Sequence, residues 1–417
     1  MGQRQTRQKV DKGLKLYHAR KTEQAVHEWK RVLSKVKEQR LRFEVLGHLA
    51  QVYGEWGFAR EKMHYAVQQM DIASDLESDE LKSESYLNLA ISNERLCEYH
   101  KSLSYARHSL ATAMSSGVGS SKLGYVYLAL AASNLGFSSF KDSLENLEKA
   151  VKMAIEAEDQ MLECEAYGCL GNVYKCLKDY DRALKFYVRA RELIRCRGQD
   201  WPPRLKTQAY LNMATAYRSM RKLDMAMDCG EEAMKLSLQQ HDHFAQARCM
   251  GVFADVHRNR GDCERAFPRY ESALNLMSDI GDRYGQIIVL AGMTKALIHM
   301  KQPEKAIDFC NKAMEVATSI GNKMCMLRSN WTLHTLYRAI GDMTSSQQHA
   351  CKFDQYLQEM ELYCGVCHEV MGNRENSLNS LTCFHIFHSR CVENSTFKTR
   401  GCPNCKKTSH LSSPVPV

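Results

Sequence analysis

The stretch Leu170–Ala190, LGNVYKCLKDYDRALKFYVRA, decides how most of this chain folds. Large and small residues alternate in it at the spacing expected of two short helices. Gly171, Ala183 and Ala190 are small enough for two helices to cross closely, and Tyr187 fills the space beside them. We therefore expect a helical hairpin over these residues.

The position of Ala183 recurs about every forty residues along the chain. Seven residues further on, a second recurring position is also mostly small in the middle of the chain. This period indicates a helical-pair repeat and resembles the tetratricopeptide repeat, although the usual period of that repeat is about 34 residues. We interpret the excess as longer helices or linkers. The first position is held by Ala25, Lys62, Ser102, Ser143, Ala183, Ala226, Ala266, Ala306 and Ser346, in which only Lys62 is large.

The repeat predicts an all-α fold, a tetratricopeptide-type helical-pair solenoid over residues 6–355. We expect about nine forty-residue units, with the first and last degenerate. Three of only seven prolines lie in the last fifteen residues, so the body is almost free of helix breakers. The segment 198–203 coincides with the longest step and is predicted to be an extended loop, in which Trp201 either packs inside or stands exposed as a contact residue.

Composition limits the function. The net charge is +9, but Lys and Arg are mixed with Asp and Glu along the chain, which indicates a solvated helical surface and no nucleic-acid partner. There is no secretory signal and no apolar run of about 18 residues. Six of the seventeen cysteines form a tight C-terminal set. We expect the other eleven to pack as small hydrophobes in a reducing compartment.

No catalytic motif stands out in residues 1–355. There is no nucleophile triad, phosphate loop or pair of carboxylates, and His257 and His334 lie at positions expected to pack between repeats. A solenoid of this kind typically binds extended peptides or partner helices on its concave face. We therefore predict a binding array with no catalytic residue.

The N-terminus, Met1–Thr6, fits the N-myristoylation pattern with Gly2 as the acceptor. One acyl chain gives only marginal membrane binding, with an association constant of about 10⁴ M⁻¹. A second signal is needed, and each basic residue near an anionic membrane adds about 1 kcal/mol. We predict a membrane anchor at residues 1–5, although a frayed and unmodified helix start is the alternative. The basic residues of this end are Arg4, Arg7, Lys9, Lys12 and Lys15.

Eight Cys and His residues near the C-terminus form four pairs at short spacing. Thiolates and imidazoles in such pairs suit tetrahedral zinc, and the spacing resembles a RING finger of the two-histidine type. The resemblance implies two interleaved zinc sites in residues 364–405, preceded by the end of a linker helix (356–363) and followed by a tail (406–417). The first site would be Cys364, Cys367, His388 and Cys391, and the second would be Cys383, His385, Cys402 and Cys405.

Many RING fingers recruit a ubiquitin-conjugating enzyme. The resemblance places that contact on Val366, Pro403 and Lys406. Active members usually have Arg at the last position, and Lys lacks its bidentate fork. Ser395 replaces the usual aromatic residue, so both departures weaken the ligase interpretation. Ser409 follows basic residues and is a candidate phosphorylation site, with an unmodified tail as the alternative.

Together these features resemble the rapsyn family of synaptic scaffold proteins. The resemblance implies a peripheral protein on the cytoplasmic face of the postsynaptic membrane, anchored by its acyl chain and basic residues. It implies clustering of nicotinic acetylcholine receptors through their cytoplasmic loops, self-association through the repeats, and linkage to dystroglycan and the cytoskeleton through the RING finger. The competing hypothesis is a RING-type ubiquitin or ubiquitin-like ligase that recruits substrate with its repeats. Segments resembling the family are Glu84–Cys97, Gly261–Ala273, Glu361–Gly365 and His385–His388.

Overall fold

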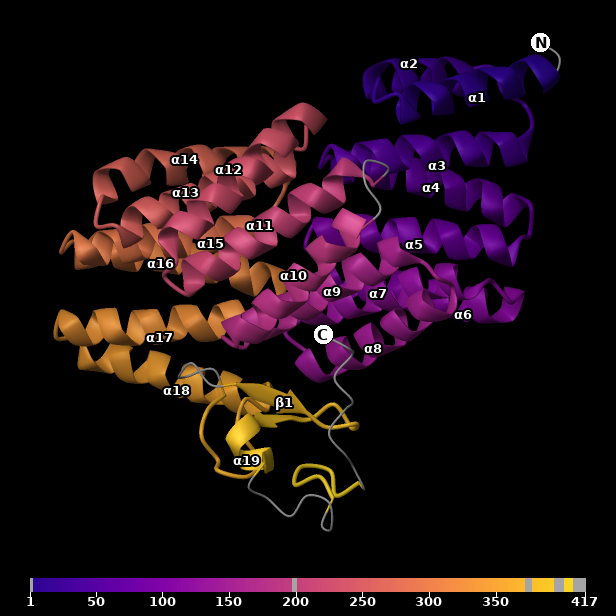
Figure 1. Cartoon of the computed structure of the whole chain (residues 1–417). Coiled ribbons are helices and arrows are strands. Elements are labelled where there is room, and N and C mark those ends of the chain that lie inside the picture. The colour runs from indigo at the N-terminus through magenta and orange to yellow at the C-terminus, as the bar shows by residue number, and fades with distance from the viewer. Residues whose placement is uncertain (1–2, 197–200, 372–376, 394–400, 408–417) are drawn as a thin grey trace.

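The computed structural model describes residues 3–196, 201–371, 377–393 and 401–407. Within these ranges the chain forms nineteen helices and two short strands (Figure 1). The first eighteen helices form nine consecutive pairs, and each pair packs against the next. The expected all-α solenoid is therefore confirmed. The first helices of the pairs are α1 (Gln3–His18), α3 (Gln39–Glu55), α5 (Asp79–Arg95), α7 (Ser120–Gly136), α9 (Gln160–Cys176), α11 (Pro203–Ser219), α13 (His243–Asn259), α15 (Arg283–His299) and α17 (Lys323–Ala339).

The second helices return along the first. They are α2 (Thr22–Leu33), α4 (Ala59–Asp75), α6 (Tyr99–Ser116), α8 (Phe140–Glu156), α10 (Tyr180–Cys196), α12 (Leu223–Gln240), α14 (Cys263–Ile280), α16 (Pro303–Ile320) and α18 (Met343–Glu359). Because a helix of 17 residues is long for this type of repeat, longer helices account for the period of about forty residues.

Local sequence sets where the helices begin and end. Asp282 caps α15 by accepting a hydrogen bond from the backbone N–H of Gly285 at 2.8 Å. Asp342 does the same for α18 with Ser345 at 3.0 Å. Such caps typically stabilise a helix by about 1 kcal/mol. At the other ends, Gly281 and Gly321 take left-handed conformations that stop α14 and α16.

The recurring small residues lie where the two helices of a pair cross. Ala183, Ala266 and Ala306 are completely buried, as expected from the repeat. The structure also explains the exception at Lys62. A Cβ atom on Gly54, on the facing helix, would lie 2.9 Å from Cδ of Lys62, so the absence of a side chain at Gly54 makes room for the lysine.

Trp201 is 5% exposed and belongs to the main hydrophobic core, so of the two roles considered for it, packing is confirmed. Most of the scattered cysteines whose side chains the structure describes are buried or half-buried, as expected. Among these, Cys351 is the exception: it lies on the exposed side of α18, and the packing prediction is wrong there.

The solenoid curves until its two halves touch. The helices of the first half and those of the second form two columns, joined across the front by α9, α10 and α11 (Figure 1). At the junction, backbone groups that follow α3 and α5 meet the starts of α13 and α15. The N–H of His243 donates to the carbonyl of Trp56 at 3.3 Å, and the Arg283 guanidinium donates to the carbonyl of Leu96 at 2.7 Å.

The same junction continues one and two repeats further along. The Asn322 side-chain amide donates to the carbonyl of Gly136 at 2.8 Å, and the Arg328 guanidinium donates to the carbonyl of Cys176 at 2.8 Å. The carbonyl groups that accept these bonds recur every forty residues, at Trp56, Leu96, Gly136 and Cys176. Each donor lies more than 150 positions further along the chain. The array is a single superhelical turn whose edges are joined by hydrogen bonds.

The C-terminal module follows α18 directly. It contains an isolated bridge between Tyr363 and Val370, two antiparallel strands, β1 (Leu378–Ser380) and β2 (Ile386–His388), and a short helix, α19 (Ser389–Glu393). The module lies beneath α10 and α18, and its buried residues join the main core of the array (Figure 1).

Candidate metal centre

Two groups of four side chains converge in the C-terminal module. The first contains Cys364, Cys367, His388 and Cys391, and their ligand atoms all lie within 4.8 Å of one another. Cys364 and Cys367 lie in a turn, His388 ends β2, and Cys391 lies in α19. His388 is completely buried, and its Nδ1 lies 3.3 Å from Sγ of Cys367.

The second group contains Cys383, His385, Cys402 and Cys405, again with ligand atoms within 4.8 Å of one another. Nδ1 of His385 lies 3.4 Å from Sγ of Cys383 and 3.6 Å from Sγ of Cys402. The loop between the strands supplies the first two residues, and the turn at 402–405 supplies the others. The structure thus brings the eight residues together in the interleaved order that the RING resemblance implies.

The electrostatics of these groups suit a cation. Burial and neighbouring thiols raise the pKa of Cys402 to about 12, because a thiolate there lacks a compensating positive charge. Burial also acts against ionisation of Cys364, but N–H groups of Cys367, His388 and Val366 outweigh it and lower the pKa of this thiol. A bound dication would stabilise thiolates in both groups.

The residues present fit zinc. Each group offers three thiol sulfurs and one imidazole, a donor set that structural zinc sites use in tetrahedral geometry. Nε2 of His388 is buried without a hydrogen-bond partner among the described residues, whereas its Nδ1 points into the group and is free to act as the ligand atom. Within the part of the chain that the structure describes, only these two groups have this metal-binding geometry.

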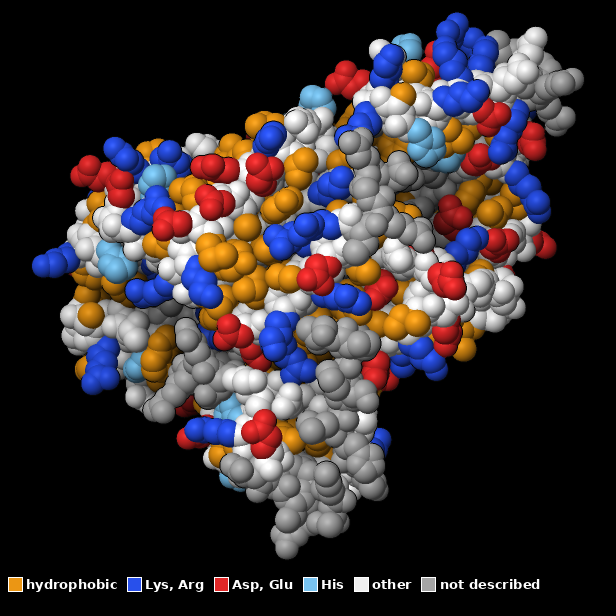
Figure 2. Space-filling view, in the orientation of Figure 1, with side chains coloured by type: hydrophobic (Ala, Val, Ile, Leu, Met, Phe, Trp, Pro, Cys, Tyr) orange, Lys and Arg blue, Asp and Glu red, His pale blue; other side chains and the backbone are white. Residues whose placement is uncertain are grey.

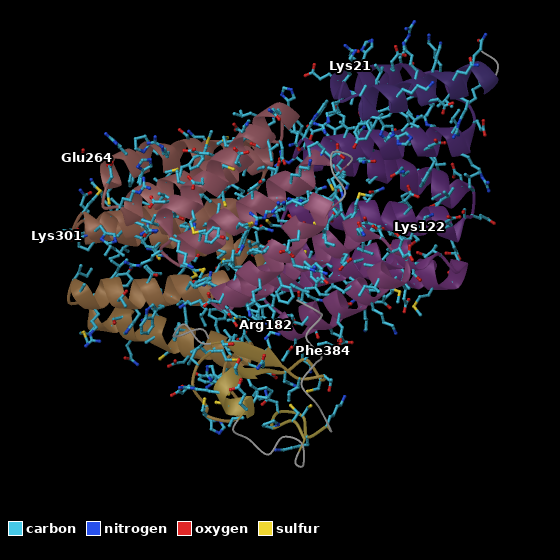
Figure 3. The ribbon with its side chains drawn as sticks, viewed as in Figure 1. Lys21, Lys122, Arg182, Glu264, Lys301 and Phe384 are labelled. Carbon is cyan, nitrogen blue, oxygen red and sulfur yellow. The ribbon has the colours of Figure 1, made fainter. Side chains whose placement is uncertain are left out.

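The array holds this module by contacts that the sequence analysis did not find. Oδ2 of Asp179 accepts a hydrogen bond from the backbone N–H of Leu378 at 2.8 Å. Arg182, at the start of α10, donates to the carbonyl of Leu378 and to Oδ1 of Asn379, the latter at 2.9 Å (Figure 3). Its guanidinium also lies over the ring of Tyr174 at 4.5 Å. Asp179 therefore has two roles: it caps the start of α10 by accepting a hydrogen bond from the backbone N–H of Arg182, and it binds the module. The second role is not visible in the local sequence.

The residues proposed to contact a conjugating enzyme are accessible to different degrees. Val366 is 37% exposed and Lys406 is exposed, whereas Pro403 is half-buried between two ligand cysteines. Ser395 and Ser409 lie outside the described residues. Accessibility therefore permits a partner at Val366 and Lys406 but does not by itself identify one.

At the opposite end of the molecule, α1 begins at Gln3, and Gly2 lies outside the described residues. Two basic residues of this helix are already paired. Arg7 contacts Glu44 at 2.7 Å and Lys12 contacts Glu28 at 2.9 Å, while Lys15 is exposed. Among the helices that the structure describes, none is long and apolar enough to cross a membrane.

Of the two histidines expected to pack between repeats, His334 does so. Nδ1 of His334 lies 3.0 Å from the carbonyl oxygen and 2.9 Å from Oγ of Ser346, which ties α17 to α18. His257 is half-exposed, and burial lowers its pKa. On the visible face of the molecule, basic and acidic side chains are interspersed (Figure 2).

The chain resembles two curated proteins over nearly its whole length. It is 39% identical over 412 residues to the 43 kDa receptor-associated protein of the synapse from Tetronarce californica, and 42% identical over 409 residues to the protein of the same name from Gallus gallus. Each alignment covers 98% of this chain and 98% of the relative. The chain belongs to the rapsyn family. Residues 1–80 also match the family model of the rapsyn N-terminal myristoylation and linker region, and residues 205–279 match a tetratricopeptide repeat model.

Solved structures support the fold of this rapsyn-family chain. A Rap protein complexed with competence and sporulation factor aligns with a TM-score of 0.55 and 11% identity, covering 78% of this chain and 99% of that protein. The hetero-tetramer Cut9-Hcn1 of APC/C aligns with a TM-score of 0.53 and 14% identity, covering 80% and 59%. At such identities the likeness shows the helical solenoid alone.

Proposed function

We propose that this chain is a membrane-anchored cytoplasmic scaffold that clusters nicotinic acetylcholine receptors at the postsynaptic membrane and links them to the cytoskeleton. The observation that carries the proposal is the match to two receptor-associated proteins of the synapse over 98% of each chain. A match of this extent spans nearly the whole of each chain, which supports a common architecture and a common role.

The architecture supports a different role for each part of the chain. Residues 1–5 anchor the protein through a myristoyl group on Gly2 and the neighbouring basic residues. Residues 6–355 form the assembling array, which binds cytoplasmic loops of the receptor and further copies of this chain. Residues 364–405 form the module that contacts dystroglycan and cytoskeletal proteins, after the helix end at 356–363.

Zinc is the proposed cofactor of the C-terminal module, with one ion in each group of four ligands. Its role is structural, because a module of about 45 residues buries too little apolar surface to fold alone. Four protein side chains would hold each ion, which would leave no open coordination position for catalysis. The tail at 406–417 carries Ser409, a proposed phosphorylation site next to the module.

A second candidate function is a RING-type ubiquitin ligase that recruits substrate through the array. The exposure of Val366 and Lys406 favours it, since a conjugating enzyme needs such a surface. Lys406 weakens it, because a lysine offers one point charge where an arginine offers a planar fork. Ubiquitin transfer by the purified full chain, compared with a Val366→Ala variant, tests this activity separately from clustering.

The proposed scaffold function requires direct binding to the receptor and to membranes. The experiment measures capture of the purified full chain by immobilised cytoplasmic loops of the receptor, with loops of an unrelated channel as the control. We expect saturable capture by the receptor loops only. Equal capture by both sets of loops, or by neither, would contradict the proposal.

A further inference from the structure

A set of basic residues gathers on the concave face of the second half of the array, and the proposed scaffold function does not use it. Five residues from five successive first helices, α9 to α17, define this inner cationic cluster. None was singled out by the sequence analysis. The inner cationic cluster consists of Lys175, Arg218, Arg248, Lys295 and Arg328.

The repeat geometry brings the cluster together. Arg248 and Arg328 are each the sixth residue of their helices, α13 and α17, so both point from the same position of the repeat. The guanidinium of Arg248 lies 5.3 Å from the ring of Tyr284 on α15. Arg328 reaches across the junction to the carbonyl of Cys176, directly beside Lys175. The curvature of the superhelix therefore joins α9 to α17 around a common interior.

Carboxylates neutralise only part of this cluster. Asp282 binds Arg248 through two hydrogen bonds of 2.7 and 2.8 Å. Asp255 is shared by Arg218 and Arg258, and it also accepts a hydrogen bond from Tyr270 at 2.6 Å. Two carboxylates thus face six cations when Arg258 is included.

Three cations of the cluster have no ion-pair partner among the described residues: Lys175, Lys295 and Arg328. Lys175 has only a neutral acceptor, Oδ1 of Asn172 at 2.9 Å. Burial, with the charges of Arg248, Arg218 and Arg328, lowers the pKa of Lys175 to about 8. The unpaired charges therefore raise the free energy of the folded protein, and an anion would relieve this cost.

Lys295 shows that the interior remains open to a ligand. Its side chain is exposed to water, yet surrounding protein and nearby arginines lower its pKa to about 8, against the attraction of Asp255. A lysine that is exposed to water and yet has a lowered pKa is expected on a concave surface. Solvent reaches such a side chain although protein surrounds most of it. The unpaired Nζ atom of Lys295 is thus available to bind.

The extent of the cluster indicates a compact ligand. At the sixth helix position, which holds arginine in α13 and α17, α5 carries Glu84 and α9 carries Glu165. Glu165 lies ten residues from Lys175, about 15 Å along the same helix. An extended acidic peptide that followed the concave face would meet these carboxylates, whereas a small anion with several charges would contact only the inner cationic cluster. Phosphate oxygens suit both the arginine fork and the lysine point charge.

We propose that the inner cationic cluster binds a small soluble anion that carries several phosphate groups, of the inositol polyphosphate class, held chiefly by Lys175, Lys295 and Arg328. The anion would bridge α9, α15 and α17. It would therefore hold the two edges of the superhelical turn together and stabilise the curved form of the array.

The test is a calorimetric titration of the full, zinc-loaded chain with inositol hexakisphosphate, in physiological salt and excess Mg²⁺. Zinc content is measured afterwards, so that loss of metal is not mistaken for binding. We expect one saturable site and a rise in Tm of about 4 °C at a ligand concentration a hundredfold above Kd. No saturable binding would overturn the proposal.

Two variants locate the site. Lys175→Met and Lys295→Met keep the aliphatic length and remove one charge each. We expect each to weaken binding at least tenfold while leaving the free protein as stable as the wild type or slightly more stable, because repulsion falls. Lys305→Met, on the exposed side of α16, is the matched control and should bind as the wild type does. Unchanged affinity in both cluster variants would overturn the site.

Two further probes decide the source of the anion. A polyglutamate peptide should bind at least tenfold more weakly than the inositol phosphate, and tighter peptide binding that depends on Lys295 would overturn the phosphate assignment. Vesicles containing phosphatidylinositol bisphosphate should bind the wild type and Lys295→Met equally, because the proposed ligand is the soluble anion. Vesicle binding that requires Lys295, without binding of the soluble ligand, would overturn the soluble source.

Discussion

Two glycines of α9 give a direct test of how the helices cross. A Cβ atom added at Gly171 would lie 2.6 Å from Cδ1 and 2.8 Å from Cζ of Tyr187, and closer still to Cε1. Tyr187 has no freedom to withdraw, because its ring is completely buried and its hydroxyl donates to Oδ1 of Asn172 at 2.9 Å. At Gly168, one turn earlier, the nearest atom to an added Cβ is Nδ2 of Asn212 at 3.6 Å, an ordinary contact.

The two substitutions therefore have opposite expected effects. Alanine is a better helix former than glycine by about 1 kcal/mol in a helix interior. At Gly168 this gain is unopposed, and Gly168→Ala should stabilise the array by about 0.5–1 kcal/mol. At Gly171 the clash with a fixed ring costs about 2–3 kcal/mol, so the net effect of Gly171→Ala is a loss of about 1–2 kcal/mol.

The assay is urea denaturation of the two variants and the wild type, followed by circular dichroism on the same day and in the same buffer. The expected order of midpoints is Gly168→Ala, then wild type, then Gly171→Ala. Because both variants add one methyl group to the same helix, propensity cancels in their comparison. A midpoint for Gly171→Ala at or above that of Gly168→Ala would refute the close crossing at Tyr187.

Three further predictions concern the two ends of the molecule and their connection. Gly2→Ala should move the protein from the membrane fraction to the soluble fraction without changing its Tm, and equal membrane fractions would contradict the acyl anchor. The full chain should contain two zinc ions and Cys364→Ser fewer than two by metal analysis; one ion or none in the wild type would contradict the two-site assignment. Arg182→Ala should weaken the attachment of the C-terminal module to the array by about 1–2 kcal/mol and speed proteolysis after α18. Lys185→Ala, on the same helix, should do neither. Equal cleavage of the two variants would show that Arg182 does not hold the module.

The sequence predicted those features that depend on short spacing. Ala183 and Ala266 mark helix crossings because a bulky side chain there would hold two helices apart, and both are completely buried. Ligand pairs such as Cys364 and Cys367 are recognisable because thiols so close in sequence have few other uses in a reducing compartment. In both cases the physical constraint operates within a few residues, so the printed sequence shows it.

Features that depend on accumulated geometry could not be predicted. The bond from Arg283 to the carbonyl of Leu96 exists because small rotations between successive repeats add up to a full turn. The contact between Asp179 and Leu378 likewise depends on where the last repeat places the metal-binding module. The sequence shows Lys62 as the one large residue of its series, but it does not show that Gly54, on the other helix of the pair, makes room for it. Gly54 faces Lys62 once the two helices of the pair pack, whereas the partners of Leu96 and Leu378 meet them only when the whole array is curved.

We propose above all that this rapsyn-family chain assembles receptors without an enzymatic step. The most direct measurement is the distribution of nicotinic acetylcholine receptors in cells that lack the chain, imaged after expression of the wild type or of Val366→Ala. We expect receptors to gather in patches that contain the chain, and we expect Val366→Ala to form the same patches even where ubiquitin transfer is lost. Receptors that stay evenly spread with the wild type, or patches that disappear in Val366→Ala while the protein stays folded and membrane-bound, would contradict it.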